Sequence, residues 1–160
     1  MIHIPLDLCM KTGLMYSKAV VREFYYPSLE NIISIVKAHG ALVSVHIDGC
    51  IKDIIEDIIN LGVDIINPIE TCGGTQDIYE LSKKYGSKIA FHGNISVYDI
   101  LVNGTPKQVE TEVKTHIEKL WNNGGYIVAS DHNLGENVPL DRIFAMRDAV
   151  HCYSSAVSKK

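Results

Sequence analysis

Hydrophobic residues recur along this chain with two alternating periods, that of a helix and that of a strand. The run 51–61, IKDIIEDIINL, places its isoleucines at helical spacing before Gly62, which predicts an amphipathic helix with a glycine stop. Short β-rich runs between such helices predict strands at 41–46, 63–67, 88–93 and 125–130. A further, truncated strand is expected in IHIPLDL, residues 2–8.

Capping and helix-breaking residues indicate the ends of the other helices. Ser17 is expected to cap a helix that Gly40 ends, and Pro27 to kink it or to split it into a short entry helix and a longer one. The buried stripe of this helix is predicted to be Ile32, Ile33, Ile35 and Val36. Further helices are predicted over 75–86, over 106–121 behind the cap Thr105, and over 139–153.

Strands and helices that alternate in this order are typical of βα units around a parallel sheet, so the predicted fold class is α/β. Four strands with a truncated fifth amount to about half of an eight-stranded (β/α)8 barrel. We therefore predict one partial-barrel domain over 1–160. Within it, 1–16 form a truncated strand and loop, 17–152 the βα units and 153–160 a frayed tail.

Composition restricts the classes of function. A chain of 160 residues with 46% hydrophobic content can bury one ordinary core. Its net charge of -4 is spread without a run of like charge, so no nucleic-acid partner is expected. No apolar stretch reaches the roughly 20 residues of a membrane span, and no signal-peptide pattern is visible, which predicts a cytoplasmic protein. No glycine-rich nucleotide motif follows a strand, so neither NAD nor ATP is expected.

The four cysteines are widely separated and form no CxxC pair, which favours free thiols in a reducing compartment over a disulfide framework. Cys50 stands in the first positions of a predicted helix, so core packing is the favoured interpretation and metal ligation the alternative. Cys72 lies in a loop between strand and helix. A reactive thiol and a structural one are both open there, and the structural role is favoured because no basic residue adjoins it.

Polar side chains gather at or just after the carboxyl ends of the predicted strands, where sites form in parallel α/β sheets. They are His46 and Asp48, Asn67 and Glu70, His92 and Asn94, and Asp131 and His132. Residues two apart on an extended segment point the same way, so His46 and Asp48 can converge on one ligand. Imidazole and carboxylate together suit zinc or another divalent ion, with His132 the best candidate for a third ligand.

Simpler roles remain open for these residues. Asp48 and Asp131 each precede a turn or helix and are alternatively helix caps. His46 is alternatively a hydrogen-bonded histidine in the wall of the barrel. The remaining histidines lie at a terminus or on predicted helices, where solvation is expected: His3, His39, His116 and His151.

The order of segments resembles the C-terminal half of the uroporphyrinogen decarboxylase superfamily, which includes the corrinoid-linked methyltransferases. Residues 11–49 are similar to the family's segment in which a helix leads to a strand ending in histidine and glycine. IAFHGNIS is similar to the strand that carries the family's GNID, and NGTPKQVETEV to its GTPEEV helix start. GGYIVASDHNLGENVPLDRIFAMRDAV is similar to the final strand, loop and helix. The resemblance covers nearly the whole chain.

The resemblance implies a (β/α)8 barrel with its pocket at the carboxyl ends of the strands. In the methyltransferase branch, zinc activates a thiol for methyl transfer from a corrinoid protein, which implies His46, Asp48 and His132 as metal ligands. Asp48 stands where that branch has a cysteine. Catalytic roles are implied for His132, Asp131 and Asp48. Contacts to a small-molecule substrate are implied for Asp7, Asn67, Glu70, His92 and Asn94.

Two alternatives accompany this interpretation. The first is metal-free decarboxylation of uroporphyrinogen in porphyrin biosynthesis, although INPIE and ASDHN stand where that branch has LDW and NLGHG. The second is a half-barrel without catalysis that serves as an assembly or binding module. Since an open half-barrel exposes strand edges, we expect a homo-oligomer, such as a homodimer, or a separate N-terminal half-barrel subunit.

Overall fold

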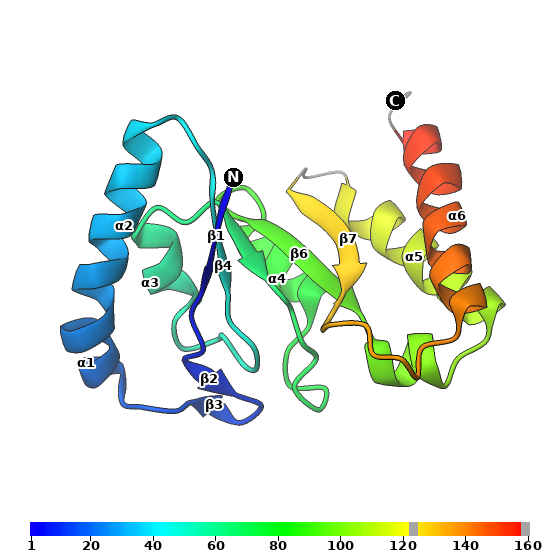
Figure 1. The fold of residues 1–160 in the computed structure, drawn as a ribbon, viewed down its shortest axis with the longest axis horizontal. Coiled ribbons are helices and arrows are strands. Elements are labelled where there is room, and N and C mark those ends of the chain that lie inside the picture. Colours follow the sequence, from blue (N-terminus) through cyan, green and yellow to red (C-terminus); the bar gives the residue numbers. More distant parts are fainter. Residues whose placement is uncertain (122–124, 158–160) are drawn as a thin grey trace.

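The computed structural model describes residues 1–121 and 125–157 and contains one curved, five-stranded parallel sheet (Figure 1). The strand order is the sequence order, β1-β4-β5-β6-β7. The strands are β1 (Ile2–Pro5), β4 (Val43–His46), β5 (Ile65–Asn67), β6 (Ala90–Ile95) and β7 (Tyr126–Ser130). The predicted partial (β/α)8 barrel is therefore confirmed, and all five expected strands are present.

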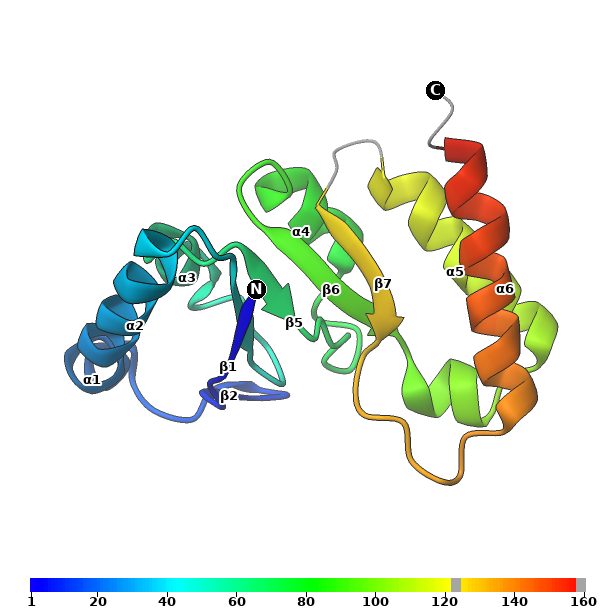
Figure 2. The same ribbon diagram turned by 45° about the horizontal axis from the view of Figure 1, so that its top comes forward.

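Helical segments connect the successive strands, and one more helix follows the last strand. They are α1 (Lys18–Val20), the π-helical η1 (Val21–Tyr25), α2 (Tyr26–Ala38), α3 (Ile55–Asn60), α4 (Ile78–Tyr85), the π-helical η2 (Val97–Val102), α5 (Pro106–Leu120) and α6 (Leu140–Val157). A small antiparallel hairpin, β2 (Cys9–Met10) with β3 (Gly13–Leu14), follows β1. Figure 2 shows α2 and α3 at the β1 end of the sheet and α5 and α6 beyond β7. Among the described residues, no helix has the length and apolar character to cross a membrane.

The hydrophobic core lies between the sheet and the helices. Val45 in β4, Ile66 in β5 and Phe91 in β6 are buried and belong to one cluster with residues of α2, α3 and α4. Residues paired across parallel strands point to the same face, so the alternate positions Ser44, His46 and Asn67 face the other side. The barrel side of the sheet therefore carries polar groups, whereas the helix side carries the core.

The helix around Pro27 divides as predicted, but its buried stripe differs from the prediction. Tyr26, Leu29 and Ile33 are buried, whereas Ile32 and Ile35 are 42% and 54% exposed. At about 100° per residue, Ile35 lies about 120° around the helix from Leu29, too far to reach the sheet. The start of the helix predicted over 51–61 was also placed too early. Residues 51–54 form a turn before α3, although Ile51 and Ile54 are fully buried.

The tail prediction was wrong up to residue 157. Residues 153–157, expected to fray, continue α6, and Tyr153 packs on the cluster formed by α5 and α6. Its hydroxyl donates to Glu110 Oε1 at 2.8 Å, which ties the last turns of α6 to α5. Residues 158–160 lie outside the described part of the chain.

Candidate functional site

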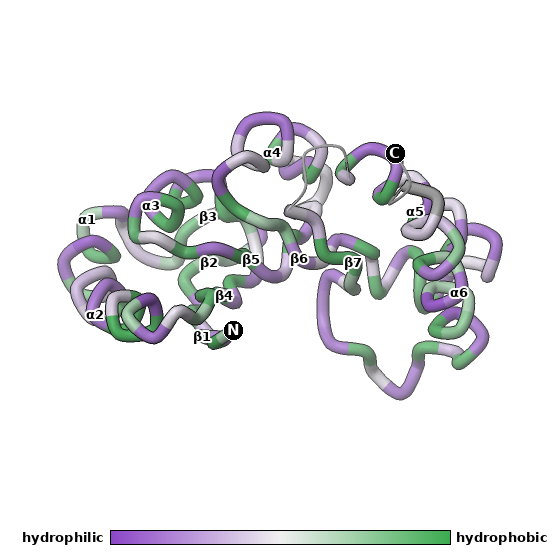
Figure 3. Tube along the Cα trace, turned by 90° about the horizontal axis from the view of Figure 1, so that it is seen from above, coloured by the Kyte–Doolittle hydropathy of each residue, from purple (hydrophilic) through white to green (hydrophobic). Residues whose placement is uncertain are grey.

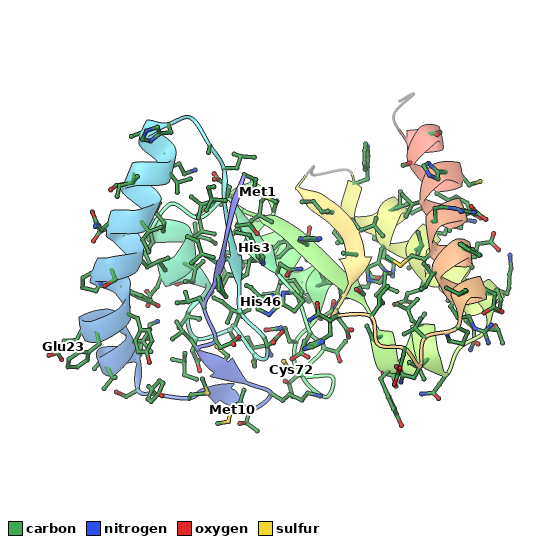
Figure 4. All side chains as sticks on the ribbon, viewed as in Figure 1. Met1, His3, Met10, Glu23, His46 and Cys72 are labelled. Atoms are coloured by element: carbon green, nitrogen blue, oxygen red, sulfur yellow. The ribbon has the colours of Figure 1, made fainter. Side chains whose placement is uncertain are left out.

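A pocket of about 250 Å³ opens at the carboxyl ends of the strands and is lined by residues from all five of them. It is lined by His3, His46, Asn67, Pro68, His92, Ala129, Ser130, His132 and Asn133. Figure 4 labels His3 and His46, which lie beside each other on β1 and β4. A larger groove of about 710 Å³ lies between α3 and α4, lined by residues such as Lys52, Leu81 and Tyr85. The lining of this groove contains no histidine, whereas that of the smaller pocket contains four, so the clustered imidazoles place the candidate site in the smaller pocket.

His46 is oriented by its neighbour on the next strand. The register pairs His46 with Asn67, and His46 Nδ1 lies 3.1 Å from Asn67 Oδ1. Asn67 Nδ2 donates to the His92 carbonyl oxygen at 3.2 Å, which turns Oδ1 toward the imidazole. Because that oxygen only accepts, the proton of a neutral His46 sits on Nδ1. The Nε2 lone pair is therefore left for a cation or a proton, the usual arrangement of a metal-binding histidine.

Asp48 joins the two histidines of the predicted ligand set. Its Oδ2 lies 3.3 Å from His46 Nε2 and 3.8 Å from His132 Nε2. Its Oδ1 is buried and has no hydrogen-bond partner among the described residues. The cap interpretation does not suit Asp48, because the Cys50 and Ile51 amides, which a cap at this position would bind, donate to other groups. Buried carboxylate oxygens normally accept a hydrogen bond or bind a cation, so this oxygen has room for a ligand that the protein atoms do not supply.

Asp7 completes the cluster. Ligand atoms of Asp7, His46 and Asp48 all lie within 4.8 Å of one another. The family resemblance implied Asp7 only as a substrate contact at the mouth of the pocket. The chain places it there through the backbone bond from Leu6 N to His46 O, 2.8 Å long. Two carboxylates and one imidazole, with a second imidazole nearby, suit a borderline or hard divalent cation and include no thiolate.

Asp131 acts as a cap, as one of its two interpretations predicted. Its Oδ1 accepts the amide proton of Val97 at 2.8 Å, at the start of η2. The element that it caps is therefore not the segment that follows it in the sequence. Burial raises the pKa of Asp131, and the bond from Val97 opposes this rise. His132, the next residue, has a side chain 52% exposed at the pocket and remains free to approach a ligand.

Asn94 does not line the pocket, which corrects its predicted place at the mouth. Gly93 and Asn94 have φ values of 127° and 87°, so the regular alternation of β6 is broken there. The Asn94 side chain turns into the helix layer, where Nδ2 donates to the Ile69 carbonyl oxygen at 2.6 Å. Its Oδ1 lies 3.0 Å from Nε2 of His116. The amide is therefore committed to structure.

Two histidines lie in places that the sequence did not suggest. His116, expected on a solvated helix face, is 1% exposed, and burial lowers its pKa. His3 is exposed, as expected at the terminus, but it also lines the pocket, with Nδ1 3.0 Å from Ser44 Oγ. Its ring centroid lies 5.9 Å from that of His46. The alternation of side chains along IHIP could have predicted this place for His3, because position 3 points to the same face of the sheet as Ser44.

His92 supplies a further imidazole from β6. Burial lowers its pKa, and the nearby His3 lowers it further. The neutral form of His92 is therefore favoured at the wall of the pocket, where it can accept a proton. Glu70, the other predicted contact, uses Oε2 to hold the Gly49 amide, so it supports the turn after Asp48.

Comparison with known proteins identifies relatives of this chain. The family model described as uroporphyrinogen decarboxylase (URO-D) matches residues 7–153. A uroporphyrinogen decarboxylase of Actinobacillus succinogenes is 28% identical over 66% of this chain and 28% of its own length. A second, of Vesicomyosocius okutanii, is 28% identical over 50% of this chain and 23% of its own length.

Among solved structures, a methyltransferase from Methanosarcina mazei has a similar fold, with a TM-score of 0.74 and 18% sequence identity. The match covers 95% of this chain and 42% of the methyltransferase. The chain therefore spans less than half of that protein, and the matched segments span about a quarter of the curated relatives.

Proposed function

We propose that this chain, which belongs to the uroporphyrinogen decarboxylase family, forms the C-terminal half of a barrel enzyme of the corrinoid-dependent methyltransferase type. We further propose that it binds zinc or another divalent cation through Asp7, His46 and Asp48, with His132 as a fourth group. The observation that carries this proposal is the buried Oδ1 of Asp48, to which no group in the described part of the chain donates and which lies near ligand atoms of Asp7 and His46. The similar methyltransferase fold supports the architecture of the proposal.

The surrounding residues fit a cation at this place. Asn67 leaves the Nε2 lone pair of His46 available, and the two carboxylates balance the positive charge of a divalent ion. When bound, such an ion supplies Lewis-acid polarisation or lowers the pKa of a coordinated thiol or water. His92, held neutral by burial, takes up a proton from the methyl acceptor, and the polar groups of Ser130 and Asn133 orient the substrate in the pocket.

The ligand set differs from the one that the family resemblance implies. Asp48 stands where a cysteine was expected, and carboxylates replace soft thiolates. A carboxylate donates less electron density than a thiolate, so the cation keeps more Lewis acidity. We therefore propose that the methyl acceptor binds through an oxygen or sulfur atom to a harder cation than in the thiolate-ligated branch.

Metal analysis tests this proposal directly. Purified protein dialysed against zinc or manganese should retain about one equivalent, measured by elemental analysis, if one site exists. His46→Ala and Asp48→Asn should each lose it, because each removes a ligand of the cluster. His39→Ala is the matched control, since His39 lies exposed on the surface after α2 and its side chain bonds, among the described residues, the Ile35 carbonyl oxygen alone. Protein that binds neither ion would contradict the proposal and favour a half-barrel binding module without catalysis.

Uroporphyrinogen decarboxylation is a second candidate, because both sequence relatives carry that name. Burial raises the pKa of Asp131, which shifts this carboxyl group beside His132 toward its protonated form, and in that form it can protonate a carbon that loses carbon dioxide. Release of carbon dioxide from uroporphyrinogen in the presence of a chelator would support this candidate. Activity that requires added cation would support the first one.

The open edges of the sheet support a partner in either case. β1 and β7 each have a neighbour on one side only. Apolar side chains lie exposed near these edges, including Ile2 on β1 and Ile127 on β7. We propose that a second half-barrel closes the sheet, either another copy or an N-terminal half. Sedimentation at micromolar concentration tests this proposal, and a stable monomer that binds no N-terminal half would contradict it.

A further inference from the structure

The turn that follows Asp48 is held in place through its backbone. Each of the three amides in the turn 49–51 donates to a different residue. The acceptors, in the order of the donors, are Glu70 Oε2 at 2.8 Å, the Met10 carbonyl oxygen at 2.9 Å and Gln76 Oε1 at 2.9 Å. Just before Asp48, the Ile47 amide donates to the Asn67 carbonyl oxygen at 2.7 Å. The backbone is therefore fixed on both sides of Asp48.

Gln76, which lies just before α4, uses its whole side-chain amide in this arrangement. It is 2% exposed, and its Nε2 donates to the Glu70 carbonyl oxygen at 2.7 Å and to the Gly49 carbonyl oxygen at 3.4 Å. Its Oε1 accepts the Ile51 amide proton at 2.9 Å. Because the amide NH2 group donates and the oxygen accepts, a reversed amide would set oxygen against two carbonyl oxygens. The bonds thus determine one orientation of the Gln76 side chain.

Gln76 also acts on the turn through Glu70. Its bond to the Glu70 carbonyl oxygen holds the backbone of the residue whose Oε2 accepts the Gly49 amide proton. The turn cannot yield toward the hairpin, since a Cβ atom at Gly49 would lie 2.6 Å from the carbonyl carbon and oxygen of Met10. The turn is therefore enclosed by the hairpin on one side and by Gln76 and Glu70 on the other.

We propose that Gln76 is a positioning residue for the cation site, an inference that rests on the proposed function. Gln76 is not among the ligand groups, and it acts through the turn that carries Asp48. Asp48 Oδ2 already lies 3.3 Å from His46 Nε2 in the structure without a cation. Because the turn is ordered on folding, the entropy of ordering it is not lost again when the cation binds. Removal of the Gln76 bonds should therefore weaken cation binding.

A comparison of the two glutamines of the chain tests this inference. Gln76→Met keeps the approximate shape of the side chain and removes its hydrogen bonds. Gln108→Met is the matched control, because Gln108 lies exposed on α5 and its Oε1 accepts the Thr105 amide proton at 2.8 Å in the helix cap. Both variants lose hydrogen bonds and should unfold at lower temperature than the wild type, but only one of them alters the turn beside Asp48.

The affinity for zinc, or for manganese if the wild type retains only manganese, separates positioning from plain stabilisation. We expect Gln76→Met to bind the cation about tenfold more weakly, as is typical when a residue that supports a metal ligand is removed. Gln108→Met should bind it as the wild type does. Isothermal titration calorimetry with the metal ion alone measures both affinities at a temperature where both variants are folded. A role in stability alone would lower the unfolding temperature and leave the affinity unchanged.

Hydrogen exchange of the wild-type protein provides a second test that needs no variant. If Gln76 and Glu70 hold the turn, the amides of 49–51 should exchange slowly without a cation, and added cation should slow them little further. Fast exchange that only the cation slows would overturn the inference, because the ion rather than Gln76 would then order the turn. This measurement decides the question even if Gln76→Met fails to fold.

The outcomes distinguish this inference from the proposed function. A folded Gln76→Met variant that binds the cation as tightly as the wild type would overturn the positioning role and leave the cation site standing. Wild-type protein that binds neither zinc nor manganese would contradict the proposed function, and the positioning role with it.

Discussion

The molecule has two hydrophobic clusters that differ in how completely they are enclosed. The first cluster, which packs β4, β5 and β6 against α2, α3 and α4, contains 22 buried residues. The second, formed mainly by η2, α5 and α6, contains seven. Seen from above in Figure 3, α2 and α3 lie at one end of the row of strands and α5 and α6 at the other end.

The difference follows from what each helix packs against. α2, α3 and α4 cover the strands, whereas α6 packs mainly on α5. Within α6, Ala149 is buried but Leu140 and Phe144 are 67% and 49% exposed. A helix that meets a sheet on one side and helices on the other loses most of its apolar surface to contacts, and α6 lacks such neighbours. The first cluster should therefore carry most of the stability.

The largest expected effect compares one isoleucine in each cluster. Ile66→Ala removes a fully buried side chain from the middle of the first cluster, and Ile117→Ala removes one from the second. We expect free energies of unfolding to fall by about 4 and about 2 kcal/mol respectively, since a thin cluster relaxes more easily around a cavity. Urea unfolding of both variants measures the difference. Equal losses would show that the two clusters are enclosed alike.

His116 lies where the two clusters meet. Its ring lies between Tyr79 of α4 and Tyr126 of β7, with centroids 5.5 and 5.9 Å away. We expect His116→Leu to lower the free energy of unfolding by about 2 kcal/mol, because the buried Oδ1 of Asn94 loses its partner. His39→Leu removes an exposed histidine and should change stability little. A His116→Leu variant as stable as the wild type would contradict the structural role of this contact.

The free energy of unfolding at acidic pH should test the role of His116 further. Burial lowers the pKa of His116, so the folded state binds fewer protons than the unfolded chain. This contribution to stability is complete above the unfolded pKa of about 6.5 and is lost as pH falls through the folded pKa. His116→Gln should show a shallower loss of stability between neutral and acidic pH. An unchanged pH profile would assign the dependence to other groups, His92 among them, whose pKa is lowered too.

Asp131 connects the pocket edge to the second cluster, and its removal should have a smaller effect. Asp131→Asn weakens the cap on Val97, which should cost about 1 kcal/mol. Because burial raises the pKa of Asp131, the wild type loses a stabilising contribution as pH rises from about 3.9 through the folded pKa. The variant should lack this loss, which a series of thermal unfolding curves can measure. Cation binding should be retained if Asp131 is only a cap.

The smallest effect on stability is expected at the uncovered face of α6. Phe144 is 49% exposed, so Phe144→Ser should change the free energy of unfolding by no more than about 0.5 kcal/mol. If a second half-barrel covers this face, the same variant should shift the sedimentation profile toward smaller species. Asp141→Asn, a change on the same helix that leaves the apolar side chains intact, is the control.

The order of strands and helices could be predicted from the sequence because it rests on local signals. Isoleucines at helical spacing, the cap at Thr105 and the glycines after helices act within a few residues of themselves. Local signals failed where the backbone departs from regular geometry. The π-helical segments η1 and η2 were not predicted, and Ile51 and Ile54 are buried from a turn rather than a helix.

The candidate site could be located from the sequence, but its membership was decided in the tertiary structure. His46 and His132 both lie near Asp48, since parallel strands bring their carboxyl ends to one edge of the sheet. His3 and Asp7 join them only because β1 pairs with β4 in one particular register. Register depends on contacts between residues some forty positions apart, and no local pattern reports it.

The sequence by itself determined the parallel α/β order and the edge at which chemistry gathers. The tertiary structure alone decided that Asn94 turns away from the pocket, where two successive positive φ values reverse its side. It also decided that the loops after β4 and β5 lie together, where Gln76 bonds both of them from a third position in the chain. Periodicity records which face of one element a side chain occupies. Which side chains of different elements converge depends on packing over the whole sheet.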